Sequence, residues 1–269
     1  MAQPEEMQIQ VNDDVSMALL VAGEGEPVIF LHGAGGLFWD PYLDQLSNQF
    51  KVYAPFMPGV GNSTGLESIL DVWGLVLTYY DLFDALELDS VNIVGHSMGG
   101  MIGCELAATD PSRIKRLLPI APAGLFDIDN PMGDIFAMVP EDLAKRIILN
   151  QDSEVAKAMF ALPDDMDEKV AVVITQISTL NAAAKFLWPL PDKGLKNRLR
   201  RIKTPTLVIW GKQDGLIPVE YAQEFKAKIP NMTLEIIDQA SHTVQLEQLL
   251  RCVELSCDFL TADNLRPAP

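Results

Sequence analysis

Val91-Asn-Ile-Val-Gly-His-Ser-Met-Gly-Gly100 is the stretch of this sequence that decides its fold. A short apolar run, typical of a buried strand, ends in a Gly-x-Ser-x-Gly turn, and a segment compatible with a helix follows at once. Such a turn holds its serine at a sharp strand-to-helix bend with a strained backbone and an exposed Oγ. Gly95 and Gly99 lack a Cβ, which lets the strand and the helix approach closely. Ser97 is therefore the candidate nucleophile.

Strands and helices alternate on both sides of this turn. After a hairpin over 6–22, apolar runs predict strands at 27–31, 51–54, 91–96, 116–121, 206–210 and 233–237, and helices are predicted at 40–48, 67–88, 98–109, 219–228 and from 243. Continuous apolar runs are typical of strands that are buried on both faces of a sheet. The alternation therefore predicts an α/β fold with a doubly wound, mostly parallel, eight-stranded sheet.

One part of the chain departs from this alternation. Residues 124–203 contain helical segments and several methionines. Within this segment no convincing strand occurs before the chain reaches Pro205. A helical insertion in such a scaffold is most simply a cap over the site. We therefore predict a core formed by residues 1–123 and 204–264, with a helical cap over 124–203.

The composition restricts the partners of the protein. The net charge of −17 argues against nucleic acid and against anionic membrane surfaces, both of which select for Lys and Arg. The N-terminus lacks the features of a signal peptide, and no run of about 18 apolar residues predicts a membrane span. Three scattered cysteines fit a reducing compartment. We expect a cytoplasmic protein that acts on a small molecule, and a homo-oligomer is compatible with the sequence.

A serine nucleophile needs a base, and the chain contains only three histidines. His96 directly precedes Ser97, so its side chain is expected to point away from the Oγ. His32 ends an early strand. His242 lies between the last strand and the last helix, where a side chain can return to the top of the sheet. His242 is therefore the predicted general base.

The imidazole in turn needs a carboxylate that holds its tautomer. Asp214 directly follows the strand over 206–210, which places it at a strand end. Asp127 and Asp129 are rivals, and Asp238 is more easily a turn residue. The order Ser97, Asp214, His242 is one of the known chain orders of such a triad.

An oxyanion hole requires two backbone N–H groups aimed at the charge that develops during the reaction. Met98, the residue after the nucleophile, is predicted to supply one of them. The glycine-rich loop His32-Gly-Ala-Gly-Gly36 is predicted to supply the other through Ala34, with Gly35 as the second choice.

Taken together, the motifs HGAGG, GHSMGG, GKQDGLIP and SHTVQLE resemble those of α/β-hydrolases of the single-domain, cap-bearing type. The resemblance covers nearly the whole chain. It implies a Ser-His-Asp mechanism with an acyl-enzyme intermediate, without cofactor or metal. It also implies that Glu247, five residues after His242, anchors the last helix.

Individual positions distinguish between the groups of enzymes that share this resemblance. Serine at position 97 argues against haloalkane dehalogenases and epoxide hydrolases, which carry aspartate there. Enzymes that hydrolyse carbon–carbon bonds in meta-cleavage products usually carry Asn before the serine and Trp after the histidine, and here these positions are His96 and Thr243. Cofactor-free haloperoxidases usually carry Phe where His96 stands. The best match is a carboxylic-ester, lactone or thioester hydrolase. Carbon–carbon hydrolysis stays open as an alternative, as does a non-catalytic ligand-binding receptor on the same scaffold.

Two features of the predicted cap bear on the substrate. Some of its apolar residues are expected to line a pocket for a small, largely apolar substrate, and the candidates are Phe136, Met138, Met159 and Trp188. The second feature is a basic cluster over 193–203, which is either a solvated helix face or an attraction for an anionic substrate.

Overall fold

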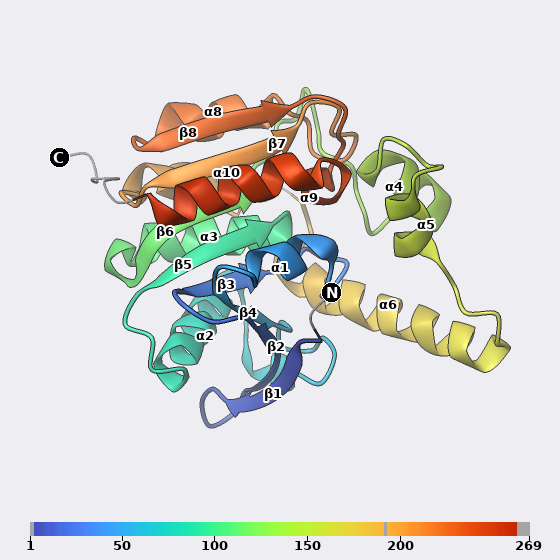
Figure 1. Cartoon of the computed structure of the whole chain (residues 1–269), viewed down its shortest axis with the longest axis horizontal. Helices are drawn as coiled ribbons and strands as arrows, with labels where there is room; N and C mark the ends of the chain where they lie inside the picture. The colour runs from blue at the N-terminus through green and yellow to red at the C-terminus, as the bar shows by residue number, and fades with distance from the viewer. Residues whose placement is uncertain (1–2, 191–192, 263–269) are drawn as a thin grey trace.

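The computed structural model describes residues 3–190 and 193–262, which form one eight-stranded sheet with helices on both faces (Figure 1). The sheet order is β1-β2-β4-β3-β5-β6-β7-β8. Only the β1–β2 and β2–β4 pairs are antiparallel. The strands are β1 Glu5–Gln10, β2 Ser16–Ala22, β3 Pro27–Leu31, β4 Lys51–Pro55, β5 Val91–His96, β6 Ile114–Ile120, β7 Thr206–Gly211 and β8 Met232–Ile237. The predicted fold class is confirmed.

Two apolar layers hold the helices against the sheet. One layer contains side chains of α2, α3 and α8, and the other contains side chains of α1, α9 and α10. The helices of the two layers are α1 Pro41–Leu46, α2 Val72–Ala85, α3 Met98–Thr109, α8 Tyr221–Lys228, α9 Val244–Glu247 and α10 Leu249–Thr261. Because helices cover both faces, the ligand-binding position left to this sheet is the carboxyl edge of its parallel strands.

Two predicted helices differ from the structure at their ends. The helix expected over 67–88 begins at Val72, because the Asp71 side chain accepts a hydrogen bond from the N–H of Gly74 and caps it. A short 3-10 turn, Leu66–Ser68, precedes it. The C-terminal helix is divided at Gln248 into α9 and α10.

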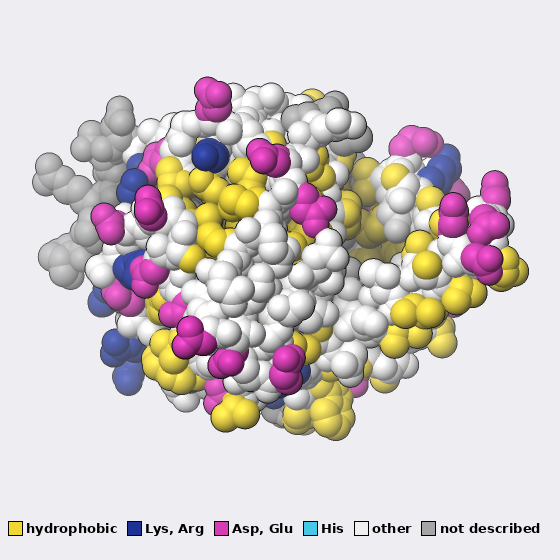
Figure 2. All heavy atoms as spheres, turned by 90° about the horizontal axis from the view of Figure 1, so that it is seen from below, with side chains coloured by type: hydrophobic (Ala, Val, Ile, Leu, Met, Phe, Trp, Pro, Cys, Tyr) yellow, Lys and Arg dark blue, Asp and Glu magenta, His cyan; other side chains and the backbone are white. Residues whose placement is uncertain are grey.

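Helices occupy the segment between β6 and β7. They are α4 Pro140–Ile147, α5 Glu154–Phe160, α6 Met166–Leu187 and α7 Leu195–Arg198, and no strand occurs in the described parts of this segment, 124–190 and 193–203. The first turns of α6 project away from the sheet (Figure 1). Ile174 and Ile177 on these turns are 58% and 63% exposed, and apolar side chains gather along this projection (Figure 2).

By length and composition alone, α6 could cross a membrane. Its last turns, however, bury Ala182, Ala183, Phe186 and Leu187 in the core of the chain. A helix that contributes to the core of a soluble domain passes the same test. The length and apolar composition of α6 therefore do not test the prediction that the chain lacks a membrane-spanning helix.

Candidate active site

Ser97 occupies the bend between β5 and α3 with a backbone that few residues adopt. Its φ is 55° and its ψ is −114°, so it is one of the few non-glycine residues with positive φ in the described chain. A Cβ at Gly99 would overlap the carbonyl of Leu31, and a Cβ at Gly95 would overlap the backbone of Gly99. The two glycines therefore allow the crossing of strand and helix that holds Ser97 in this conformation.

Asp214 and His242 meet at the same edge of the sheet. Asp214 follows β7 and His242 follows β8, and Oδ2 of Asp214 accepts a 2.9 Å hydrogen bond from Nδ1 of His242. Both side chains are buried, at 0% and 4% exposed. Since the carboxylate is an acceptor, Nδ1 of His242 is the donor of this bond, and Nε2 is the ring nitrogen left for another partner.

That Nε2 atom is buried and has no hydrogen-bond partner in the described part of the chain. A buried polar atom of this kind calls for an explanation, since burying it without a partner is costly. One explanation is that this imidazole nitrogen takes a proton from a nucleophile during catalysis. Ser97 directly follows His96, whose ring centroid lies 4.9 Å from that of His242, so the candidate nucleophile and the candidate base lie in the same part of the fold.

Further donors fix the position of the Asp214 carboxylate. Its Oδ1 accepts 2.9 Å hydrogen bonds from the backbone N–H groups of Leu216 and Ile217, and its Oδ2 also accepts one of 3.1 Å from Nε1 of Trp210. With these donors on one side, the carboxylate keeps the orientation in which Oδ2 faces Nδ1 of His242. The sequence reasoning missed Trp210, although a tryptophan at the end of a buried strand has an N–H that needs an acceptor.

The glycine-rich loop after β3 lies beside Ser97, the candidate nucleophile. A Cβ at Gly33 would lie 3.4 Å from Cβ of Ser97. Ala34 in this loop is buried, and Gly35 has open space where a Cβ would lie. Met98 is the first residue of α3. The loop and the helix start thus lie close together, as an oxyanion hole would require.

His32 is a structural residue of this loop. Its Nδ1 donates a 2.7 Å hydrogen bond to the carbonyl of Gly33, and its Nε2 accepts one of 3.1 Å from the N–H of Met57. Burial lowers the pKa of the imidazole, and its hydrogen bond to Gly33 opposes that shift. A neutral His32 therefore fixes the loop to the chain that follows β4.

The side chain of His96 lies against His242, the candidate base. Its Nε2 donates a 3.0 Å hydrogen bond to the carbonyl of His242, and the two imidazole rings are 4.9 Å apart between centroids. Burial, reinforced by the nearby His242, lowers the pKa of His96 to about 3. The sequence had only placed this side chain away from the Oγ, and had not predicted its bond to His242.

The C-terminal end of α4 and the residues directly after it hold the chain on both sides of His242. The carbonyl of Ile147 accepts hydrogen bonds from the N–H and the Oγ1 of Thr243, at 3.0 and 2.9 Å. The carbonyl of Arg146 accepts one of 2.5 Å from Oγ of Ser241. The Glu247 carboxylate accepts from the N–H of Ser241 at 2.7 Å and also reaches this segment. Glu247 thus joins the His242 loop to the segment between β6 and β7, beyond the anchoring of a helix that the resemblance implied.

The rival carboxylates lie in other surroundings. Asp127 forms a turn in which its Oδ1 accepts from the N–H of Asp129, and its own N–H bonds to Tyr221. Asp238 forms an ion pair with Lys212 at 2.6 Å. Of the carboxylates considered, Asp214 is the one hydrogen-bonded to His242.

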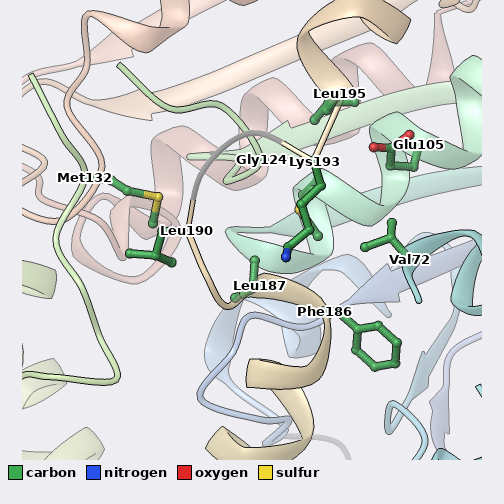
Figure 3. A pocket seen from close by; sticks show the side chains of 10 residues that line it. Val72, Glu105, Gly124, Met132, Phe186, Leu187, Leu190, Lys193 and Leu195 are labelled. Carbon is green, nitrogen blue, oxygen red and sulfur yellow. The ribbon is translucent and has the colours of Figure 1, made fainter. Parts of the chain in front are cut away.

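The four residues that were predicted to line a substrate pocket lie in different parts of the structure. Phe136 and Met138 pack partly buried against one apolar layer and Met159 against the other, while Trp188 is 56% exposed. None of them lines the small cavity beside α3 (Figure 3). That cavity is lined by Val72, Met101, Glu105, Gly124, Met132, Phe186, Leu187, Leu190, Lys193 and Leu195. At about 20 Å³ it has room for roughly one water molecule, so it holds no substrate in this conformation.

The basic cluster over 193–203 is largely engaged within the protein. Arg198 forms a bidentate ion pair with the buried Glu105, in which Nε donates to Oε2 at 2.6 Å and Nη2 donates to Oε1 at 2.7 Å. Lys196 pairs with Glu224 at 3.2 Å, and Arg201 donates to the carbonyl of Ala108. These contacts favour a structural role for the cluster over attraction of an anionic substrate.

Comparisons with known proteins place the chain in a family of hydrolases. The chain is 28% identical to 2-hydroxy-6-oxo-2,4-heptadienoate hydrolase of Pseudomonas putida, over 90% of this chain and 91% of that protein. It is 29% identical to pimeloyl-[acyl-carrier protein] methyl ester esterase of Aliivibrio salmonicida, over 82% and 86%. The solved structure of a bacterial membrane phospholipase A superposes with a TM-score of 0.80, at 21% identity, over 99% of this chain and 88% of that one. The model of the alpha/beta hydrolase fold matches residues 26–249, so the chain belongs to the alpha/beta hydrolase fold family.

Proposed function

We propose that this protein is a serine hydrolase that cleaves the carboxylic ester, lactone or thioester bond of a small, largely apolar substrate. The observation that carries the proposal is the buried His242, whose Nδ1 is bonded to Asp214 and whose Nε2 has no hydrogen-bond partner in the described chain. Such a nitrogen is poised to take the proton of Ser97.

The proposed reaction proceeds in two stages. Ser97 Oγ attacks the carbonyl carbon of the ester while its proton passes to Nε2 of His242, and the backbone N–H groups of Met98 and Ala34 stabilise the oxyanion. The proton then passes to the departing alcohol, which leaves an acyl group on Ser97. Water, deprotonated by His242, attacks that acyl group, and the acid is released as the serine regains its proton.

The substrate is proposed to bind between the sheet edge and residues 124–203, which would act as the cap. Support comes from the hydrogen bonds between Ile147 and Thr243, because they tie this segment to the loop of the base. Water is then excluded from the site, which strengthens the interactions with the developing charge.

The experiment is a comparison of Ser97→Ala with the wild type on p-nitrophenyl acetate and butyrate. Loss of turnover by at least about 10³-fold with an unchanged circular dichroism spectrum is expected. Ser68→Ala removes an exposed serine hydroxyl whose hydrogen bond in the described chain goes to the carbonyl of Gly65, and serves as the matched control with full activity. Retained esterase activity in Ser97→Ala would contradict the proposal.

A second candidate function is hydrolysis of a carbon–carbon bond. The relatives named 2-hydroxy-6-oxo-2,4-heptadienoate hydrolase and 2-hydroxymuconate semialdehyde hydrolase, each 28% identical, favour it. His96 and Thr243 depart from the pattern usual in such enzymes. The ratio of kcat/KM on a 2-hydroxy-6-oxo-dienoate to kcat/KM on the two esters separates the candidates.

A receptor without catalysis is distinguished by covalent labelling. A fluorophosphonate reacts only with a serine whose base and oxyanion donors are in place. Labelling of the wild type at Ser97, and none in Ser97→Ala, would support the enzyme. A wild type that is not labelled would support the receptor.

A further inference from the structure

His96 lies beside His242 and has no role in the reaction proposed above. It ends β5 and directly precedes Ser97, so its Cα is held by the same strand that positions the nucleophile. Its ring faces the loop Ser241–Thr243, which carries the base.

That loop is held at three successive residues. Ser241 is held by Glu247 and Arg146, and Thr243 is held by Ile147. These three contacts come from α9 and from the C-terminal end of α4, and none of them comes from the strand that carries Ser97. The contact of His96 with the carbonyl between them comes from the nucleophile's own strand.

The hydrogen bond defines the tautomer of His96. A carbonyl only accepts, so Nε2 of His96 carries the proton and Nδ1 is bare. The Nδ1 atom faces Gly33 of the oxyanion loop, where a Cβ would lie 3.2 Å from it. One imidazole thus contacts the oxyanion loop on one side and the loop of the base on the other.

His96 must also stay neutral for this arrangement to persist. The charged or titratable groups that act on it are His242, whose proton uptake disfavours a second cation, and Asp214, which has a weaker opposite effect. Burial is the largest cause of its lowered pKa. His96 therefore keeps its single N–H on Nε2 while His242 becomes an imidazolium in each turnover.

We propose that His96 is a positioning residue, which holds the main chain of His242 at a fixed distance from Ser97 through its Nε2–H. This inference rests on the proposed function, since it assigns His242 the role of base. In this role His96 aligns the proposed nucleophile with the proposed base. Its loss should therefore affect the chemical step and have little effect on substrate binding.

Two substitutions separate the hydrogen bond from the ring. His96→Phe keeps an aromatic ring against His242 and removes the donor, and His96→Gln keeps an N–H donor at about the reach of Nε2 and removes the ring. We expect His96→Phe to lower kcat about three- to tenfold, the cost of one neutral hydrogen bond, with KM changed less than about twofold. His96→Gln should recover most of kcat.

Three kinetic outcomes would overturn the proposal. The first is an equal kcat in the wild type and His96→Phe. The second is an equal loss of kcat in His96→Phe and His96→Gln, because the ring and not its N–H would then matter. The third is a loss confined to KM, which would assign His96 to substrate binding.

A measurement on the wild-type protein does not depend on the folding of variants. In a ¹⁵N-histidine-labelled sample, the nitrogen chemical shifts should show His96 protonated on Nε2 and bare on Nδ1, and should keep that pattern at pH 5. Protonation on Nδ1 with a bare Nε2 would overturn the inference. Because this readout needs no turnover, its failure is distinguishable from a failure of the proposed function, which the Ser97→Ala kinetics report.

Discussion

The carboxylate of Glu247 accepts a 2.7 Å hydrogen bond from the backbone N–H of Leu149. Its other oxygen accepts one of 2.7 Å from the N–H of Ser241, the residue before His242. A single side chain therefore connects the segment after α4 to the loop of the proposed base, so the position of that segment and the position of His242 are coupled.

Glu247→Gln tests this coupling. An amide offers one acceptor oxygen, and its NH₂ group would face a backbone N–H, leaving a donor without an acceptor. We expect the free energy of unfolding to fall by about 1–3 kcal/mol and kcat on p-nitrophenyl butyrate to fall several-fold. Glu254→Gln removes an exposed carboxylate of α10 as a control and should change neither quantity. Equal stability of the two variants in urea unfolding would contradict the prediction.

Trp210→Phe tests the support of Asp214. The substitution removes the Nε1–H that bonds Oδ2 of Asp214 at 3.1 Å, and leaves an aromatic ring in the core. Because hydrogen bonds to charged groups are the stronger ones, kcat/KM should fall roughly tenfold. The control is Trp39→Phe, since the buried Nε1 of Trp39 has no hydrogen-bond partner in the described residues. Similar kcat/KM losses in both variants would show that the indole N–H of Trp210 has no special part.

Most of the sheet and the identities of the candidate residues could be predicted because their signals are local. The bend at Ser97 is a short motif, and the helix after it was predicted with the observed bounds, Met98–Thr109. Asp214 follows a buried strand, and His242 follows the last one. With three histidines in the chain, few assignments were open.

The contacts around these residues could not be predicted in the same way. His96 and His242 are 146 residues apart, and their hydrogen bond depends on how β5 and the loop after β8 are placed in the sheet. The hydrogen bonds accepted by Arg146 and Ile147 depend on the path of the chain after β6. Residue periodicity does not predict that path, because the described parts of this segment contain no strand that would join the sheet. The start of α2 was predicted too early, because Asp71 caps the helix within an apolar stretch.

Gly99→Ala tests the close approach of α3 to β3. A Cβ at this position would overlap the carbonyl oxygen of Leu31, and neither the helix nor the central strand can easily move. We expect the free energy of unfolding to fall by at least about 2 kcal/mol, measured in urea. Gly35→Ala is the matched control, because nothing lies within 4 Å of a Cβ there, and its stability should stay within about 0.5 kcal/mol of the wild type. Equal losses in both variants would contradict the assigned close approach.

Asp40→Asn tests a buried helix cap through its dependence on pH. Asp40 is 5% exposed and accepts a 2.8 Å hydrogen bond from the N–H of Leu43, and burial raises the pKa of its carboxyl to about 6 despite its hydrogen bonds to the backbone. Between about pH 4 and pH 6 the folded chain therefore holds a proton that the unfolded chain has lost. The contribution of Asp40 to stability is then highest below that window and decreases as the pH rises through it.

Asparagine keeps the capping oxygen and cannot ionise, so Asp40→Asn escapes this decrease. The free energy of unfolding of the variant relative to the wild type should rise between pH 4 and pH 7, by up to about 3 kcal/mol. The control is Asp71→Asn, because Asp71 caps α2 from an exposed position where water solvates the carboxylate. Its difference from the wild type should change much less over the same range. A difference between Asp40→Asn and the wild type that is constant from pH 4 to pH 7 would mean that the buried cap is ionised throughout, held by its backbone donors against the cost of burial.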